Sequence, residues 1–148
     1  MATISNLRRI SAKSLSEKII SERDSPNPSY AIIDVRDDDY IGGHIKGCTN
    51  IPTIQLDAMM PTLVRKLKDK KTVVFHCALS QQRGPSAALK YLREKDELSK
   101  RLNVEGETAG AVEQEIVVLD KGFVGWQQDY GADERLTEGY VKDIWENY

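Results

Sequence analysis

Three short apolar runs, separated by segments with helical periodicity, are the feature that most constrains the fold of this chain. The runs are residues 30–35, 72–75 and 116–119. Each is apolar or β-branched with little polar alternation, which is typical of strands buried on both faces of a sheet. Helical patterns follow at residues 56–67 and after Gly84. Strands that alternate with helices favour an α/β fold, with a parallel sheet that helices cover on both faces.

Other local patterns predict the remaining elements. Ser14 and Glu17 match a capping box, so we expect a helix over residues 15–21. Short helices are predicted at residues 123–129 and near the end of the chain, at 140–145. Residues 103–115 contain glycine and acidic residues without periodicity, which predicts a flexible loop.

Size, charge and cysteine content narrow the class of protein. At 148 residues the chain fits one domain, residues 1–148. Lysine and arginine number 21 against 23 acidic residues, a net charge of −2, which argues against a nucleic-acid partner. No apolar span reaches membrane length, so no membrane partner is expected. Two cysteines are too few for a disulfide scaffold, which favours a cytoplasmic or nuclear location and leaves a thiol available for chemistry.

The stretch HCALSQQRG, residues 76–84, carries the strongest indication of function. Cys77 follows a predicted strand, and Arg83 stands six residues later, just before a predicted helix. The carboxyl end of a parallel strand is where α/β proteins bind ligands, and loop amides with a helix N-terminus stabilise anions there. The same donors favour a thiolate, while Arg83 offers a planar fork for two oxygens of phosphate or arsenate. An inert buried cysteine is the alternative.

Three separated motifs carry a family resemblance. HCALSQQRGP resembles the H-C-x5-R-G-P loop of the M-phase inducer dual-specificity phosphatases and of fungal arsenate reductases. AIIDVRDDDYIGGHIKGCTNIP is similar to the rhodanese signature D-x-R…G-G-H-I-x-G-A-x-N-I-P, and VVLDKGFVGWQ is similar to its closing motif. Together they cover about residues 30 to 130. The resemblance implies a rhodanese-like α/β domain, with a parallel central sheet of about five strands and helices on both faces.

The resemblance also assigns roles by position. Cys77 would be the nucleophile that forms a phosphocysteine, and Arg83 would hold the oxygens of the substrate. His76, Asp34 and Gly84 would support the loop, with Asp34 accepting hydrogen bonds from loop amides. The phosphate-binding loop itself would consist of Ala78, Leu79, Ser80, Gln81, Gln82 and Arg83. No metal and no cofactor are expected.

Several alternatives stay open. The first hypothesis is a phosphatase of the protein tyrosine or dual-specificity type that hydrolyses phosphate monoesters, with a phosphoprotein among the candidate substrates. The second is an arsenate reductase that uses glutathione and glutaredoxin. Thiosulfate-type sulfur transfer is disfavoured because the loop is one residue longer than in those enzymes, and a noncatalytic binding module would need neither Cys77 nor Arg83.

Three features of the sequence depart from the family pattern or have no catalytic role assigned to them. Ala78 and Gln82 stand where the M-phase inducers carry acidic residues, so the general acid is undetermined. Cys48 is expected to be a plain buried thiol. The acidic run at residues 37–39 lacks calcium-loop spacing and is expected to be solvated.

Overall fold

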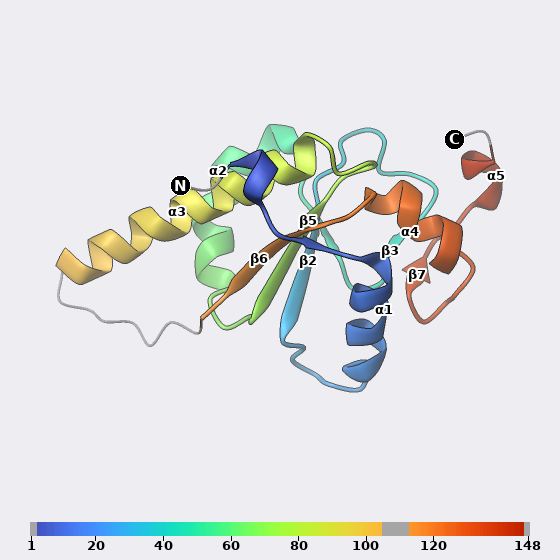
Figure 1. Cartoon of the computed structure of the whole chain (residues 1–148), viewed down its shortest axis with the longest axis horizontal. Coiled ribbons are helices and arrows are strands. Elements are labelled where there is room, and N and C mark those ends of the chain that lie inside the picture. The colour runs from blue at the N-terminus through green and yellow to red at the C-terminus, as the bar shows by residue number, and fades with distance from the viewer. Residues whose placement is uncertain (1–2, 105–112, 147–148) are drawn as a thin grey trace.

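The computed structural model describes residues 3–104 and 113–146 and contains a five-stranded sheet in which every neighbouring pair is parallel (Figure 1). The strand order is β1 (Arg9–Ile10), β6 (Glu115–Leu119), β5 (Thr72–His76), β2 (Tyr30–Asp34) and β4 (Thr49–Asn50). The expected parallel sheet is confirmed, and its three longest strands are the three apolar runs of the sequence.

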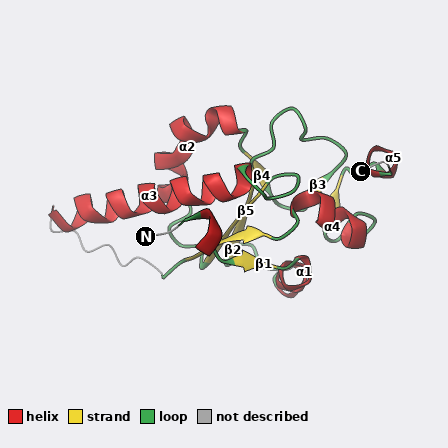
Figure 2. Cartoon of the chain, turned by 45° about the horizontal axis from the view of Figure 1, so that its top comes forward, coloured by secondary structure: helices red, strands yellow, loops and turns green. Residues whose placement is uncertain are grey.

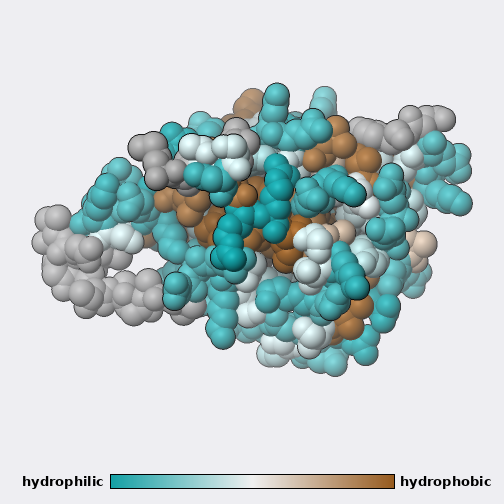
Figure 3. Space-filling view, viewed as in Figure 1, coloured by the Kyte–Doolittle hydropathy of each residue, from teal (hydrophilic) through white to brown (hydrophobic). Residues whose placement is uncertain are grey.

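Helices cover both faces of this sheet (Figure 2). One face carries α2 (Thr53–Lys66) and α3 (Arg83–Val104), and the other carries α1 (Ala12–Ser21) and α4 (Gly122–Tyr130). Two short helices, η1 (Ile4–Asn6) and α5 (Lys142–Trp145), lie near the ends of the chain. Figure 3 shows one face of the molecule as mostly hydrophilic, with hydrophobic side chains visible near its centre.

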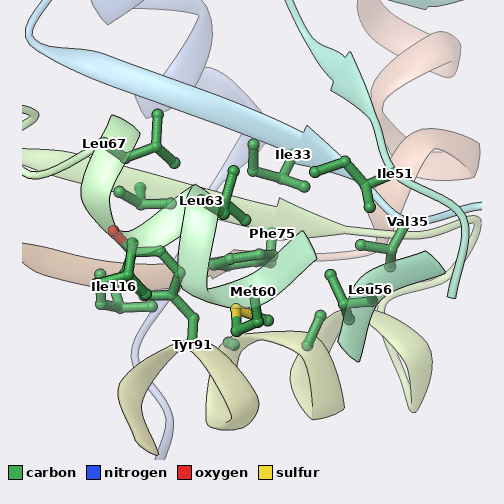
Figure 4. Close-up of a cluster of buried hydrophobic side chains, with 14 of the residues drawn as sticks. Ile33, Val35, Ile51, Leu56, Met60, Leu63, Leu67, Phe75, Tyr91 and Ile116 are labelled. Carbon is green, nitrogen blue, oxygen red and sulfur yellow. The ribbon is translucent and has the colours of Figure 1, made fainter. Parts of the chain in front are cut away.

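Alternation along the strands sends successive side chains to opposite layers. Ile33 of β2 and Phe75 of β5 pack with Leu63 of α2 in one buried cluster, shown in Figure 4. Their neighbours Ile32 and Val74 belong to the cluster on the opposite face. Interior strands therefore bury both faces, as their continuous apolar runs predicted.

Local details differ from the expectations at several points. Helix α1 begins at Ala12, and its N-cap is Ser11, whose side chain accepts from the Ser14 amide. The capping box predicted at Ser14 is therefore wrong. Helix α3 continues to Val104, into the segment predicted as a loop, and the rest of that prediction falls mainly on residues 105–112, outside the described part.

The four two-residue strands of the described chain were not predicted individually, and β4 pairs with the outer side of β2. β1 pairs with the outer side of β6, while β3 (His44–Ile45) and β7 (Thr137–Glu138) form a separate antiparallel ribbon. Strand β5 lies in the middle of the main sheet and ends at His76, so the Cys77 loop begins at the carboxyl edge of the sheet. In the described part of the chain, no helix is both long and apolar enough to cross a membrane.

Candidate active site

Cys77 is the residue around which the loop after β5 closes. Its side chain is buried, and its Sγ accepts hydrogen bonds from the backbone N–H of Ser80, at 3.2 Å, and of Gly84, at 3.4 Å. Helix α3 begins at Arg83, so the Gly84 amide belongs to its first turn. Two N–H donors and a helix N-terminus therefore converge on one sulfur.

Ser80 is the sharpest bend of this loop. It has a φ of 56°, a left-handed conformation that is uncommon outside glycine, and it is fully buried. Its N–H faces Cys77, while its carbonyl oxygen accepts a 3.1 Å hydrogen bond from the guanidinium of Arg9. Arg9 also lies 3.6 Å from a carboxylate oxygen of Asp120. Strand β1 thus holds the outer side of the bend.

The start of α4 holds two more carbonyls of the loop. The Phe123 amide donates to the Cys77 carbonyl at 3.0 Å, and the Val124 amide donates to that of Ala78 at 2.9 Å. Gly122, with a φ of +57°, brings this turn so close that a Cβ there would lie 2.4 Å from the Ala78 oxygen. The segment that resembles the closing motif of the family therefore also fixes the loop.

His76 lies fully buried directly before the nucleophile candidate. Its Nδ1 is 3.1 Å from the Cys77 carbonyl oxygen, and burial lowers the pKa of the imidazole. A carbonyl only accepts hydrogen bonds, so Nδ1 carries the proton of the neutral ring. Nε2 faces the Asp34 carboxylate at 3.7 Å, too far for a hydrogen bond. The ring thus contacts the loop backbone, as expected of a supporting residue.

Asp34 is a structural acceptor, and Arg36 supplies its donors. The Arg36 amide donates to it at 3.0 Å, and the Arg36 Nε and Nη2 donate at 3.0 and 2.8 Å. Both side chains are fully buried. Asp34 thus accepts from an amide of the loop after β2, as expected of a structural acceptor, and the Arg36 guanidinium occupies the rest of the carboxylate.

Arg36 extends this support to the loop that follows β2. Its Nη2 also donates to the carbonyl of Gly43 at 2.9 Å, and its guanidinium lies 4.5 Å from the centre of the Phe123 ring. A buried guanidinium between a carboxylate, a carbonyl and an aromatic face fixes the segment between residues 36 and 43. That segment contributes the acidic residues that reach Arg83.

The side chain of Arg83 is bound by two of those acidic residues. Its Nη1 and Nη2 lie 2.8 and 2.6 Å from the two carboxylate oxygens of Asp39, and Nη1 lies 3.3 Å from Asp37. These hydrogen bonds lower the pKa of Asp39 and raise that of Arg83. The expectation of a merely solvated acidic run is therefore wrong for Asp37 and Asp39.

The other predicted loop residues divide by exposure. Ala78 is buried, and Leu79 is about half exposed, at 46 %. A Cβ at Gly84 would lie 3.1 Å from the His76 Cα and 3.3 Å from the Cys77 amide nitrogen, so the helix approaches the strand end closely. Gln81 and Gln82 are exposed.

Cys48 lies at the end of the β3–β4 turn and takes no part in the Cys77 loop. It is only partly exposed, and burial raises the pKa of its thiol to about 12. Its Sγ is 3.9 Å from the hydroxyl of Tyr40. A thiol of this kind is protonated at neutral pH, which fits the inert role expected for Cys48.

Four contributors to the site escaped sequence reasoning. Arg36 could have been found, since the D-x-R spacing pairs it with Asp34, and Gly122 could have been found from the closing motif. Arg9 and Asp39 carry no local pattern, because each meets the loop only through the fold. Among the residues that the structure describes, His, Cys, Asp and Glu form no group of three that could hold a metal ion.

Comparisons with known proteins identify sequences that are similar to this chain. Residues 11–129 match the family described as "Rhodanese-like domain". A relative named "CDC25-like phosphatase YCH1", from Saccharomyces cerevisiae, is 39 % identical over 127 residues, 78 % of each chain. "Arsenate reductase 2.1" of Oryza sativa is 39 % identical over 117 residues, 78 % of this chain and 68 % of the relative.

A solved structure gives the same picture. Ygr203w, described as a yeast protein tyrosine phosphatase of the Rhodanese family, superimposes with a TM-score of 0.76 at 32 % identity. The match covers 97 % of this chain and 100 % of the other. The expected rhodanese-like fold is therefore confirmed.

Proposed function

The chain belongs to the rhodanese-like domain family, beside proteins named as phosphatases and arsenate reductases, and from that premise we propose that it is a cysteine-dependent phosphatase acting on phosphate monoesters. The observation that carries the proposal is the Cys77 sulfur, which accepts N–H bonds from Ser80 and Gly84 inside a loop that ends in Arg83. A sulfur held in this way is prepared for nucleophilic attack.

The reaction follows from the loop. The Cys77 thiolate attacks phosphorus in line with the ester oxygen, and the S–P bond forms as the P–O bond breaks. Amides of the loop and the Arg83 guanidinium hold the other phosphate oxygens, where negative charge is concentrated. Water then attacks the phosphocysteine and releases inorganic phosphate. Positive charge comes from the protein's own amides and arginine, so the proposal names no metal.

Arsenate reduction is a second candidate, favoured by one observation within the loop. Ala78 and Gln82 provide no acidic proton for an ester leaving group, whereas a protonated arsenate carries protons of its own and can lose a hydroxyl as water. Cys77 would displace that group and form an S–As bond. A glutathione thiolate would then attack the Cys77 sulfur, so that a mixed disulfide forms while the S–As bond breaks and its electron pair reduces As(V) to As(III). Glutaredoxin would reduce that disulfide and restore Cys77.

Paired assays separate these activities. We expect steady hydrolysis of para-nitrophenyl phosphate by the wild-type chain, and its loss in Cys77→Ser. Arg83→Ala should lower kcat/KM by about 10²- to 10³-fold, the range seen when one donor to a developing charge is removed. Cys48→Ser is the matched control and should retain activity. Glutathione-dependent arsenite production without ester hydrolysis would favour the reductase, and full activity in Cys77→Ser would refute both.

A further inference from the structure

The fork of Arg83 that the proposed function assigns to substrate is occupied by a side chain of the protein. Both terminal nitrogens of Arg83 point at the two oxygens of Asp39, at 2.8 and 2.6 Å. This is the paired arrangement in which a guanidinium also binds two oxygens of a phosphate. A carboxylate and a phosphate cannot use the same two N–H groups at once.

We propose that Asp39 sets the oxyanion affinity of the site by competing with substrate for Arg83. The inference rests on the proposed function, because it takes Arg83 as the group that binds the oxyanion. Arg83 would leave Asp39 when an oxyanion enters the loop and return when product departs. Asp39 would thereby weaken the binding of substrate and also of product phosphate.

The surroundings of Asp39 keep its carboxylate in place for this competition. Its Oδ1 accepts a 3.0 Å hydrogen bond from the Asp37 amide, and its backbone carbonyl lies 3.5 Å from the Nη1 of the buried Arg36. The carboxylate is thus oriented without Arg83. The Arg83 and Asp39 side chains are 34 % and 33 % exposed, so water can solvate both partners when they separate.

The neighbouring acidic residues do not share this arrangement. Asp37 accepts from the amide and the hydroxyl of Thr53, at 2.8 and 2.6 Å, and reaches Arg83 through one longer contact of 3.3 Å. Asp38 is exposed, and no contact between it and Arg83 exists among the described residues. Asp38 therefore supplies a control with the same charge, in the same loop, without the bond.

The test compares Asp39→Asn with Asp38→Asn. Asparagine keeps an oxygen that can accept from the Asp37 amide but removes the charge that holds Arg83. A partly exposed ion pair of this kind corresponds to a change of about two- to fivefold in an equilibrium constant. We expect Asp39→Asn to lower both the Kd for inorganic phosphate and the KM for para-nitrophenyl phosphate by that factor, with kcat within about twofold of wild type. Asp38→Asn should change neither constant appreciably.

Phosphate binding is read from the protection of Cys77 against iodoacetamide, which does not depend on turnover. Equal tightening in both variants would indicate a general charge effect and overturn the proposal. Weaker phosphate binding or a much lower kcat in Asp39→Asn would show that Asp39 positions Arg83 for substrate, which also overturns it.

The same measurements distinguish a failure of the proposed function from a failure of the proposed competition between Asp39 and substrate. If the wild-type chain neither hydrolyses esters nor reduces arsenate, but Asp39→Asn still binds phosphate more tightly than Asp38→Asn, the function fails and the competition stands. If phosphate protects Cys77 in none of the three proteins, the competition is overturned as well.

Discussion

The turn at Gly122 lies so close to the Cys77 loop that the position of the loop depends on the absence of a side chain there. In Gly122→Ala the new Cβ would lie 2.4 Å from the Ala78 oxygen and 2.6 Å from the Cys77 oxygen. Ordinary contact begins near 3.4 Å, so the two segments must separate by roughly 1 Å. The hydrogen bonds from Phe123 and Val124 to the loop carbonyls would lengthen accordingly.

Gly122→Ala should destabilise the folded state in two ways, and a control substitution isolates one of them. A left-handed conformation costs about 1–2 kcal/mol for alanine, and weakening two buried hydrogen bonds adds roughly 1–2 kcal/mol. Gly139 has a similar φ, +65°, but among the described residues, apart from its chain neighbours, no atom lies within 4 Å of a Cβ there. Gly139→Ala should therefore bear only the first cost. A loop displaced by about 1 Å should also lose about 10²-fold in kcat/KM, which Gly139→Ala should not.

Urea unfolding and para-nitrophenyl phosphate hydrolysis measure both effects. We expect Gly122→Ala to lower the free energy of unfolding by about 2–4 kcal/mol, and Gly139→Ala by about 1–2 kcal/mol. Activity is measured without urea, at a temperature at which circular dichroism shows that both variants are folded. If Gly122→Ala matched Gly139→Ala in both stability and kcat/KM, the idea that this turn positions the loop would be refuted.

Two further predictions concern the supports of the loop. Arg9→Met should lower kcat/KM and reduce the free energy of unfolding by about 1 kcal/mol, because it removes the hydrogen-bond donor to the carbonyl of Ser80, a residue in the left-handed conformation. Arg8→Met changes a side chain that is 75 % exposed and should alter neither quantity. Equal effects of the two substitutions would contradict this prediction. Burial lowers the pKa of His76 in the folded state. Below about pH 6.5 the unfolded state therefore binds a proton that the folded state does not. The free energy of unfolding should then fall as the pH decreases, by at most about 1.4 kcal/mol per pH unit. When urea unfolding is measured between pH 5 and 8, the free energy of unfolding of His76→Asn should depend less steeply on pH than that of the wild type. An unchanged pH dependence would rule out His76 as its source.

The sheet and the position of the nucleophile could be predicted because each depends on local sequence. Residues 30–35, 72–75 and 116–119 bury both faces, so their continuous apolar character indicates interior strands whatever their partners are. Cys77 follows one such strand directly, so its place at the carboxyl edge is a consequence of chain order. In the same way the spacing of apolar residues indicated the buried face of α2.

Elements that depend on distant partners left no comparable pattern. β1 is two residues long and exists as a strand because it pairs with β6, more than 100 residues later. The ribbon of β3 and β7 joins segments separated by a similar distance. The N-cap of α1 was predicted wrongly for a local reason. Ser11 and Ser14 both satisfy the residue preference at an N-cap, and only the packing of the helix selects Ser11.

In the candidate site, the inward-facing N–H groups of the Cys77 loop could be predicted from sequence, but the partners of its outward-facing carbonyls could not. An anion-binding loop turns N–H groups inward, and its short, uncharged sequence between Cys77 and Arg83 indicates this. The carbonyls must then point outward, and buried carbonyls need donors. Those donors come from Arg9 in β1 and from the start of α4 at Phe123 and Val124, segments distant along the chain that only the folded sheet brings to the loop. A loop transplanted with its own nine residues alone would lack these donors, so the inward arrangement of its amides depends on the whole sheet.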